Sequence, residues 1–255
     1  MNSHAKTAFG EFLGTFILVF IGCSSVALEV LHSSFNSLAI IASIWGIAVI
    51  LAILASRPFS PAHLNPAVSI AMAVLKKTRW SQLPLLIGFQ FLGAFLAGAS
   101  IYLLFSTSLI DFETSNNILR GTTSSQASAV MFGEFYTTNV AHPHLYACLA
   151  EGTGTFLLMT VILIVSRTEK ISAFLPPLFI GIGLSIIIFI IAPYTQAGLN
   201  PARDFAPRIL AYFFGWENAA FPHISYSFFT VYILSPILGA LIAAASYVSL
   251  SRLKS

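Results

Sequence analysis

The sequence has very little charge. Only 8% of its 255 residues are Asp, Glu, Lys or Arg, and 57% are hydrophobic, whereas soluble domains carry roughly 25% charged residues. This composition excludes a soluble globular protein and indicates a chain that folds in a lipid bilayer. The formal charge of +3 is small, and the basic residues lie at the ends of apolar runs and in short connections, so we expect no nucleic-acid partner.

Cysteine is also scarce. Cys23 and Cys148 both lie within or at the edge of apolar runs, so we expect two buried free thiols and no disulfide framework. The N-terminal stretch has one lysine, Lys6, before a long apolar run that lacks a small-residue cleavage site. It therefore predicts a retained first span and not a signal peptide.

Six apolar runs are long enough to cross a membrane, which takes about 20 residues for each span. They cover Phe9–Leu31, Leu38–Ser56, Leu83–Phe105, Tyr146–Ser166, Ala173–Tyr194 and Tyr226–Leu250. Two shorter pieces, Asn65–Leu75 and Asn200–Phe213, begin with Asn-Pro-Ala and predict helices that enter only half of the membrane. The predicted fold class is an all-α polytopic membrane protein with six transmembrane helices and two half-helices, in one domain over residues 1–255.

The basic residues predict how the chain lies across the membrane. Arg120, Arg203 and Arg208 would lie on one side, and the other nine basic residues would lie opposite. Because Lys and Arg accumulate on the cytoplasmic side, we expect both termini in the cytoplasm, in a plasma membrane or a bacterial inner membrane. The segment Ser106–Leu145 is then an outside loop. The nine residues are Lys6, Arg57, Lys76, Lys77, Arg79, Arg167, Lys170, Arg252 and Lys254.

The chain repeats itself at long range. Glu11–Phe16 (EFLGTF) returns as Glu151–Phe156 (EGTGTF), and Asn-Pro-Ala begins at both positions 65 and 200. More loosely, Gly93–Ala97 returns as Gly239–Ala243, and the three pairs are 135 to 146 residues apart. We therefore expect a first repeat of about residues 5–106, a loop of about 107–145 and a second repeat of about 146–252. Since each repeat has an odd number of spans, the two repeats are inverted in the membrane.

The Asn-Pro-Ala triplets predict helix starts. Asn is a preferred N-cap and Pro is best tolerated at the first helical position, so Asn65-Pro66-Ala67 and Asn200-Pro201-Ala202 should each begin a half-helix. One triplet is weak evidence, but two in equivalent positions of an inverted repeat indicate a functional site. Two starts that meet from opposite leaflets would place two positive dipole ends and two Asn carboxamides at the midplane. Cations are repelled there, and neutral hydroxyl groups are favoured.

Around these triplets the sequence resembles the aquaporin superfamily. His63–Val68 (HLNPAV) and Gly198–Asp204 (GLNPARD) look like its paired signatures, and the resemblance covers essentially the whole chain. It implies a passive pore in each protomer, usually within a homotetramer, with small neutral solutes as partners and no cofactor. It also implies that loop backbone before each half-helix lines the pore. These loop residues are Ala62, His63, Leu64, Gln196, Gly198 and Leu199.

Four residues correspond, by this resemblance, to a selectivity filter. Arg203 lies in the first turn of the second half-helix, where a charge at membrane depth is costly and expected to be functional; the alternative is an arginine that reaches the interface. The other three are Trp45, Ile188 and Ala197, although Trp45 alone would also fit an interfacial anchor. This ring most resembles the filter of the plant nodulin-26-like group, which passes glycerol and other small neutral solutes.

Neighbouring positions also resemble the glycerol-facilitator branch. Asp204 follows the filter arginine and Arg208 lies four residues later, so the two could pair on one helical turn. Tyr232 departs from the branch, which usually has Pro there, and Pro61 and Gln196 stand where it usually has Gly. Gln196 could narrow the pore or add a hydrogen-bond donor, and the sequence leaves both open.

Two acidic residues, Glu11 and Glu151, occupy equivalent positions inside spans, where an unpaired carboxylate is costly. Catalysis or proton relay is conceivable, but the resemblance implies that they hold the half-helix loops by hydrogen bonds, and we expect Asp204 to support a loop in the same way. His142 and His144 have no third ligand nearby, so we expect no metal site.

The function that these features favour is passive diffusion of glycerol and other small neutral solutes, with water, through a channel that excludes ions and protons. The nearest alternative is an orthodox water-selective channel. A secondary transporter also uses inverted repeats and broken helices, but beyond Arg203 the expected path has no ionisable group for coupling. The sequence has no catalytic motif of paired acids, metal-binding histidines or an activated nucleophile, so we expect no enzyme.

Overall fold

The computed structural model describes residues 3–166, 172–222 and 227–252, and within these ranges the regular elements are all helices. In chain order they are α1 (Ser3–His32), α2 (Leu38–Ser56), α3 (Pro66–Val74), η1 (Trp80–Gln82), α4 (Leu83–Leu104), α5 (Ser106–Ser115), η2 (Thr123–Ser125), α6 (Gln126–Ala129), α7 (Pro143–Val165), α8 (Leu175–Thr195), α9 (Pro201–Ala211), η4 (Tyr212–Trp216), η5 (Glu217–Ala220), α10 (Ser227–Phe229), η6 (Thr230–Leu234) and α11 (Ser235–Arg252).

Six helical segments are long and apolar enough to cross a membrane. They are α1, α2, η1 with α4, α7, α8, and the run from α10 to α11. The predicted all-α class with six spans and two short half-helices is therefore confirmed. α1 begins at Ser3 and not at Phe9, and α7 begins at Pro143 and not at Tyr146. Tyr226 and the basic residues Arg167, Lys170 and Lys254 lie outside the described residues.

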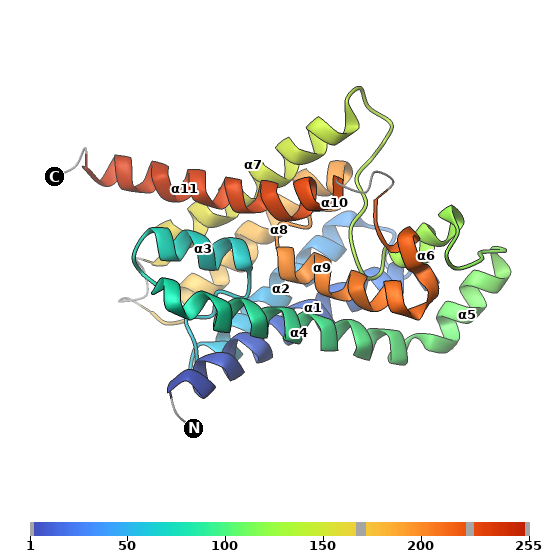
Figure 1. Cartoon of the computed structure of the whole chain (residues 1–255), viewed down its shortest axis with the longest axis horizontal. Helices are drawn as coiled ribbons and strands as arrows, with labels where there is room; N and C mark the ends of the chain where they lie inside the picture. The colour runs from blue at the N-terminus through green and yellow to red at the C-terminus, as the bar shows by residue number, and fades with distance from the viewer. Residues whose placement is uncertain (1–2, 167–171, 223–226, 253–255) are drawn as a thin grey trace.

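The two halves of the chain pack in the same way. α1 contacts α2 and α4, and α7 correspondingly contacts α8 and α11. Each half-helix packs on the last span of the other half, α3 on α11 and α9 on α4, while α2 and α8 join the halves directly. In Figure 1 the start of α1 and the end of α11 lie at one end of the molecule, and α5 and α6 lie at the other end. The half-helices lie between these ends.

Glycines permit the closest of these helix crossings. A Cβ atom at Gly93 of α4 would collide with the carbonyl oxygen of Phe12 in α1, and a Cβ at Gly239 of α11 would collide with that of Gly152 in α7. Small residues let membrane helices approach until their backbones touch. The two equivalent crossings therefore hold the first and last spans of each half together.

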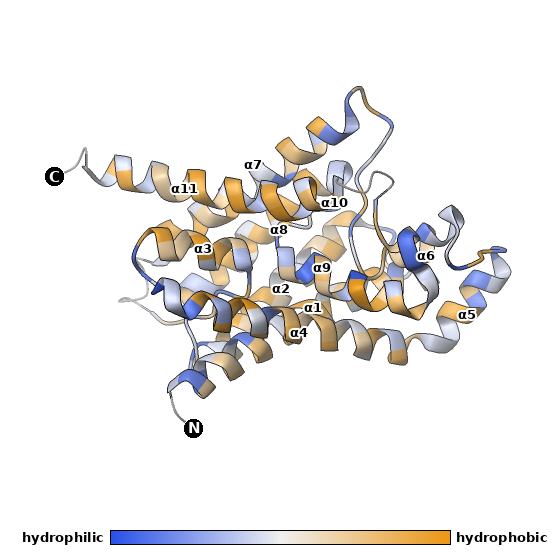
Figure 2. Cartoon of the chain, viewed as in Figure 1, coloured by the Kyte–Doolittle hydropathy of each residue, from blue (hydrophilic) through white to orange (hydrophobic). Residues whose placement is uncertain are grey.

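Figure 2 shows orange, hydrophobic residues along most of the spans, and blue, hydrophilic residues mainly at the helix ends, in α5 and α6, and in α9. Lipid cannot hydrogen-bond to a helix surface, so exposed apolar side chains along a span are expected. The hydrophilic part of α9 lies inside the molecule: Arg203, Asp204 and Arg208 are all buried. The half-helix α9 thus places three charged side chains in the protein interior.

Two regions differ from the sequence prediction. The segment Ser106–Leu145, expected to be a loop, contains α5 and the short α6. The last span is not one regular α-helix, because residues Thr230–Leu234 form the π-helical turn η6 between α10 and α11. π-helical turns are often found at functional sites, and this one contains Tyr232.

Candidate functional site

The two half-helices begin at Asn65 and Asn200, whose side chains cap them. Asn65 Oδ1 accepts a hydrogen bond from the backbone N–H of Ala67 (2.9 Å), and Asn200 Oδ1 accepts from that of Ala202 (3.1 Å). Pro66 and Pro201 occupy the first helical positions. This is the standard chemistry of an N-cap followed by Pro at position N1, and it occurs twice.

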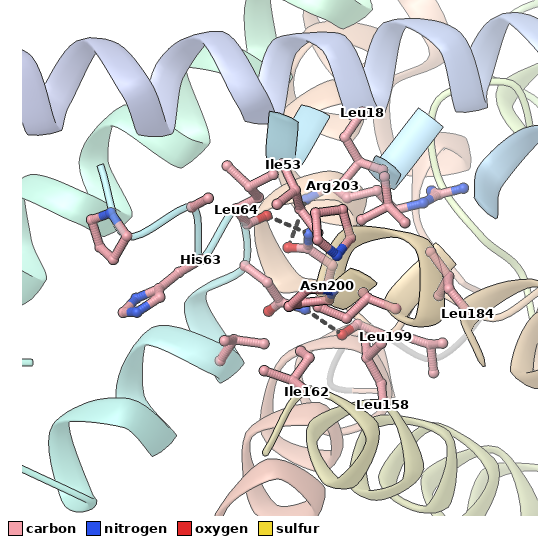
Figure 3. A pocket seen from close by; sticks show the side chains of 18 of the residues that line it. Leu18, Ile53, His63, Leu64, Leu158, Ile162, Leu184, Leu199, Asn200 and Arg203 are labelled. Atoms are coloured by element: carbon pink, nitrogen blue, oxygen red, sulfur yellow. Dashed lines mark hydrogen bonds between the residues drawn. The ribbon is translucent and has the colours of Figure 1, made fainter. Parts of the chain in front are cut away.

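Each of these asparagines also binds the opposite loop. Asn65 Nδ2 donates to the carbonyl oxygen of Leu199 (2.9 Å), and Asn200 Nδ2 donates to that of Leu64 (2.7 Å). The dashed lines in Figure 3 mark these two crossed hydrogen bonds. A carboxamide nitrogen has two N–H groups, so each asparagine ties the two halves together with one of them.

The loops before the half-helices have an unusual backbone. Ala62 and Leu64 have positive φ angles (54° and 53°), and so do the equivalent Ala197 and Leu199 (64° and 52°). Non-glycine residues in this region cost about 1–3 kcal/mol each and persist only where the surroundings hold them.

Two buried carboxylates hold these loops. Glu11 accepts hydrogen bonds from the backbone N–H groups of His63 (3.0 Å) and Leu64 (2.8 Å). Glu151 accepts from those of Gly198 (2.9 Å) and Leu199 (2.6 Å). Both carboxylates are fully buried. Their repeated contacts stabilise the strained backbone that carries each loop into the interior.

A cavity of about 440 Å³ runs past both helix starts. In Figure 3 His63 lies toward one end of the side chains drawn and Arg203 toward the other, with Asn200, Leu64 and Leu199 between them. The predicted site residues among its lining are Trp45, Ala62, His63, Leu64, Asn65, Ile188, Ala197, Gly198, Leu199, Asn200 and Arg203. The rest of the lining is mostly apolar, and its polar residues are Arg57, Ser60, His63, Asn65, Lys77, Thr78, Ser166, Asn200 and Arg203. The expectation that the path has no ionisable group beyond Arg203 is therefore wrong, because Arg57, His63 and Lys77 also line the cavity.

Arg203 and Trp45 face each other across one part of this cavity. The Arg203 guanidinium carbon lies 4.4 Å from the centre of the Trp45 ring, a distance typical of a cation–π contact. Both side chains are buried. Gly22 of α1 leaves room for the indole, because a Cβ at this position would collide with the Trp45 ring. Trp45 therefore points inward and is not an interfacial anchor.

Arg203 has a partner that the sequence prediction missed. Its Nη2 forms an ion pair with Glu134, which lies in the segment between α6 and α7 and is buried. Among the described residues, Arg203 Nη1 is buried and has no hydrogen-bond partner. Glu134 belongs to no motif or repeat, and the position of its segment depends on tertiary contacts, so no sequence signal indicated it.

A second buried ion pair lies beside the first. Asp204 and Arg208 are fully buried and form the pair expected on one helical turn, with Arg208 Nε 2.8 Å from Asp204 Oδ2 and Nη2 2.9 Å from Oδ1. Asp204 Oδ1 also accepts from the Glu134 backbone N–H (2.8 Å), and Arg208 Nη2 donates to the Glu134 carbonyl. This pair therefore holds the peptide groups of Glu134 on both sides.

Comparisons with known proteins agree with this geometry. The family model described as "Major intrinsic protein" matches residues 1–247. The chain belongs to the major intrinsic protein family. It is 41% identical to the glycerol uptake facilitator protein of Pseudomonas aeruginosa, over 93% of this chain and 85% of the relative. It is 30% identical to human aquaporin-9, over 97% of this chain and 83% of the relative.

A solved structure shares the fold of this major intrinsic protein. The X-ray structure of the aquaglyceroporin from Plasmodium falciparum superimposes with a TM-score of 0.81 over 96% of this chain and 95% of that chain, at 24% sequence identity. The arrangement of spans and half-helices is therefore that of a known channel fold. The protein is a multi-pass membrane protein.

Gln196 and Tyr232, which depart from the glycerol-facilitator pattern, both bind backbone. Gln196 Oε1 accepts from the backbone N–H of Phe135 (2.6 Å), and the residue is not among those described as lining the cavity. Gln196 thus holds the segment of Glu134 and neither narrows the cavity nor adds a donor to it. The Tyr232 hydroxyl donates to the carbonyl oxygen of Thr195 (3.2 Å), while Pro61 lines the cavity.

The histidines and cysteines make other contacts. His144 Nε2 lies 2.6 Å from Thr230 Oγ1, and Cys148 Sγ lies 3.7 Å from the same nitrogen. Within the described ranges, no group of three potential ligands gathers to hold a metal ion. Cys23 is a buried free thiol, and Cys148 is a half-buried free thiol.

Proposed function

We propose that this chain is a passive channel for glycerol and other small neutral solutes, with some water flow, and that it excludes ions and protons. The names of the relatives, a glycerol uptake facilitator protein and an aquaporin, support this proposal. Members of the major intrinsic protein family are channels, so the chain is not an enzyme.

The observation that carries the proposal is the cavity with Trp45, Ile188, Ala197 and Arg203 in its lining. The indole and the two aliphatic side chains offer apolar surface to the CH groups of a polyol. Arg203 Nη1, which has no hydrogen-bond partner among the described residues, offers a donor to its hydroxyl groups. A solute with one apolar and one polar side matches this lining better than water alone does, because buried polar groups need partners and apolar groups do not.

Exclusion of cations and protons follows from the two helix starts. The N-terminal ends of α3 and α9 meet at Asn65 and Asn200, and each end carries about half a positive elementary charge. Arg203, in the first turn of α9, places a cation on the same path, and Glu134 pairs with it. A cation would meet like charge on entering the pore, whereas a neutral solute loses only its hydration, which the amide donors replace.

One experiment separates this proposal from its alternatives. Purified protein in proteoliposomes should be tested by stopped-flow light scattering with water, glycerol and a six-carbon polyol, with empty liposomes as the baseline. We expect clear glycerol flux, some water flux and little flux of the larger polyol. Water flux without glycerol flux would indicate an orthodox water channel and would overturn the proposal.

We also propose a homotetramer in a plasma membrane or bacterial inner membrane, with both termini in the cytoplasm. One supporting observation is that the start of α1 and the end of α11 lie at one end of the molecule (Figure 1). Another is that the distribution of basic residues along the sequence assigns Lys6, Lys76, Lys77 and Arg79 to the same side of the membrane as the termini. A fluorescent-protein fusion at the C-terminus should fold and fluoresce, while an alkaline phosphatase fusion there should be inactive. Chemical cross-linking in the membrane should yield a ladder that ends at four subunits.

A further inference from the structure

The carboxylate of Glu134, a residue that lies outside both sequence repeats, contacts the filter arginine Arg203. It lies between α6 and α7, is 3% exposed, and forms an ion pair with Arg203 Nη2. It is not among the residues that line the cavity, whereas Arg203 is. Any effect of Glu134 on a passing solute therefore acts through Arg203.

The segment that carries Glu134 is held firmly in place. The backbone N–H of Glu134 donates to Asp204 and its carbonyl accepts from Arg208. The next N–H, of Phe135, donates to the Gln196 side chain at 2.6 Å. Two residues farther on, the N–H of Thr137 donates to the Tyr194 carbonyl at 2.9 Å. A carboxylate held by four such contacts has a defined position relative to α9, so it can fix the guanidinium.

This pairing determines what Arg203 presents to the cavity. Nη2 is used by Glu134, the face of the guanidinium lies over the Trp45 ring, and Nη1 is left without a partner among the described residues. The carboxylate also cancels the charge of the arginine. Desolvating an unpaired buried charge is far costlier than desolvating a paired one.

We propose that Glu134 is a positioning residue for solute selectivity: its ionised carboxylate holds Arg203 against Trp45 and neutralises it, so that Nη1, with its two N–H groups, faces passing glycerol. The inference rests on the proposed glycerol channel. When the carboxylate is removed or neutralised, Arg203 becomes an uncompensated buried cation that turns toward water in the cavity. The filter then becomes narrower and binds water more tightly. Glycerol is the larger solute, so its permeability should fall more than that of water.

The proposal gives the channel a pH dependence near neutrality. Burial raises the pKa of Glu134 to about 7, although Arg203 opposes the shift. At higher pH the Glu134 carboxylate is ionised and pairs with Arg203. At lower pH the carboxyl group is neutral, and Arg203 loses its countercharge. The other titratable or charged groups that face this pair are Cys23 of α1, Glu151 of α7, Asp204 and Arg208 of α9, and Tyr232 of η6.

The test measures glycerol and water permeability in proteoliposomes with equal pH on both sides, from about pH 5.5 to about pH 8.5, a range that brackets a carboxyl group titrating near neutrality. We expect wild-type glycerol permeability to fall by roughly two-fold or more toward acid pH, with a smaller change for water. Glu134→Gln keeps the shape and an acceptor oxygen but not the charge. It should reproduce the acid-pH level of the wild type at every pH.

A matched control removes another ion pair of the same chemistry. Glu113 pairs with Arg120 at 2.8 Å, and neither residue lines the cavity, so Glu113→Gln should keep the wild-type pH profile. Equal amounts of folded protein are verified by the elution profile and the thermal midpoint of each variant. A channel with no glycerol flux at any pH would defeat the proposed function itself.

Three results would overturn the role of Glu134 while leaving the glycerol channel intact. The first is a wild-type profile that is flat across this range, which needs no variant to observe. The second is an acid-pH decrease that persists in Glu134→Gln, which would assign it to another group such as His63 at the other end of the cavity. The third is Glu134→Gln with wild-type permeabilities at high pH.

Discussion

At the scale of single residues, the polar atoms beside the cavity differ in whether they have hydrogen-bond partners. Asn200 Oδ1 accepts from two backbone N–H groups, and its Nδ2 donates to Leu64. Arg203 Nη1 has no partner among the described residues. A buried donor without a partner costs about 1–3 kcal/mol, so a hydroxyl group that passes and accepts from Nη1 is stabilised there. Unpaired atoms at this point thus favour a solute with hydroxyl groups.

Replacing Asn65 or Asn200 by Asp should reduce solute flux and stability together. A carboxylate cannot donate to the carbonyl oxygen that each carboxamide now contacts at 2.9 or 2.7 Å, and the two oxygens would repel each other. The loss of one buried hydrogen bond should lower the free energy of unfolding by about 1–3 kcal/mol. Glycerol flux per folded channel and thermal unfolding in detergent measure both effects.

Asn116 provides the control, because it is exposed and its Nδ2 donates to the Phe112 carbonyl of the helix α5 that ends just before it. Asn116→Asp should change neither quantity appreciably. If both pore variants keep wild-type flux, the two asparagines are helix caps and nothing more.

Ile188→His should raise the ratio of water to glycerol permeability. Ile188 lines the cavity together with Trp45 and Arg203, so a larger polar ring there narrows the passage and removes apolar surface. Glycerol is penalised by both changes, because its CH groups lose an apolar wall, whereas water needs only space and hydrogen-bond partners. Ile188→Leu keeps volume and polarity and should leave the ratio unchanged. If Ile188→His lowers the water and glycerol permeabilities in equal proportion, Ile188 is not part of the selectivity ring.

At the scale of elements, the helix crossings depend on glycine. A Cβ at Gly239 of α11 would collide with the backbone of α7, and a Cβ at Gly93 of α4 would collide with that of α1. Gly93→Ala and Gly239→Ala should each lower the thermal midpoint, since backbone atoms cannot move aside as a flexible side chain can. Gly88 of the same helix α4 has nothing within 4 Å of an added Cβ. Gly88→Ala should be neutral or stabilising, by up to about 1 kcal/mol from helix propensity. A midpoint unchanged in all three variants would contradict close packing at these crossings.

The sequence predicts the elements better than the contacts between them. Long apolar runs define the six spans, and Asn followed by Pro defines each half-helix start, because both signals are local. Glu134 and Gln196 are different, since their partners Arg203 and Phe135 lie about 60 to 70 residues away and no local rule sets that pairing. The π-helical turn at Tyr232 is also missed, as hydropathy is the same for an α-helix and a π-helix.

At the scale of the whole molecule, the inverted repeat is not symmetric in its chemistry. Around α3 the supporting groups are neutral apart from Glu11: Gln90 Nε2 donates to Glu11 (2.7 Å) and to Ser69 (2.9 Å). Around α9 they are two buried ion pairs, Arg203 with Glu134 and Arg208 with Asp204. The two repeats thus share a backbone frame, and both buried ion pairs lie beside the second half-helix.

The whole molecule should also be unable to couple solute movement to an ion gradient. Two helix N-termini lie on the path beside the Arg203–Glu134 pair, and their positive dipole ends oppose the entry of sodium ions or protons. Glycerol flux should therefore rise linearly with its concentration difference and stop when the two sides are equal, whatever gradient of pH or sodium is imposed. The proposed role of Glu134 agrees with this, because a carboxylate that takes up a proton at equal pH on both sides changes the filter and transfers no proton across the membrane. Counterflow of labelled glycerol in proteoliposomes, with and without a pH or sodium gradient, measures this. Accumulation of glycerol above equilibrium under either gradient would show a coupled transporter in place of a channel.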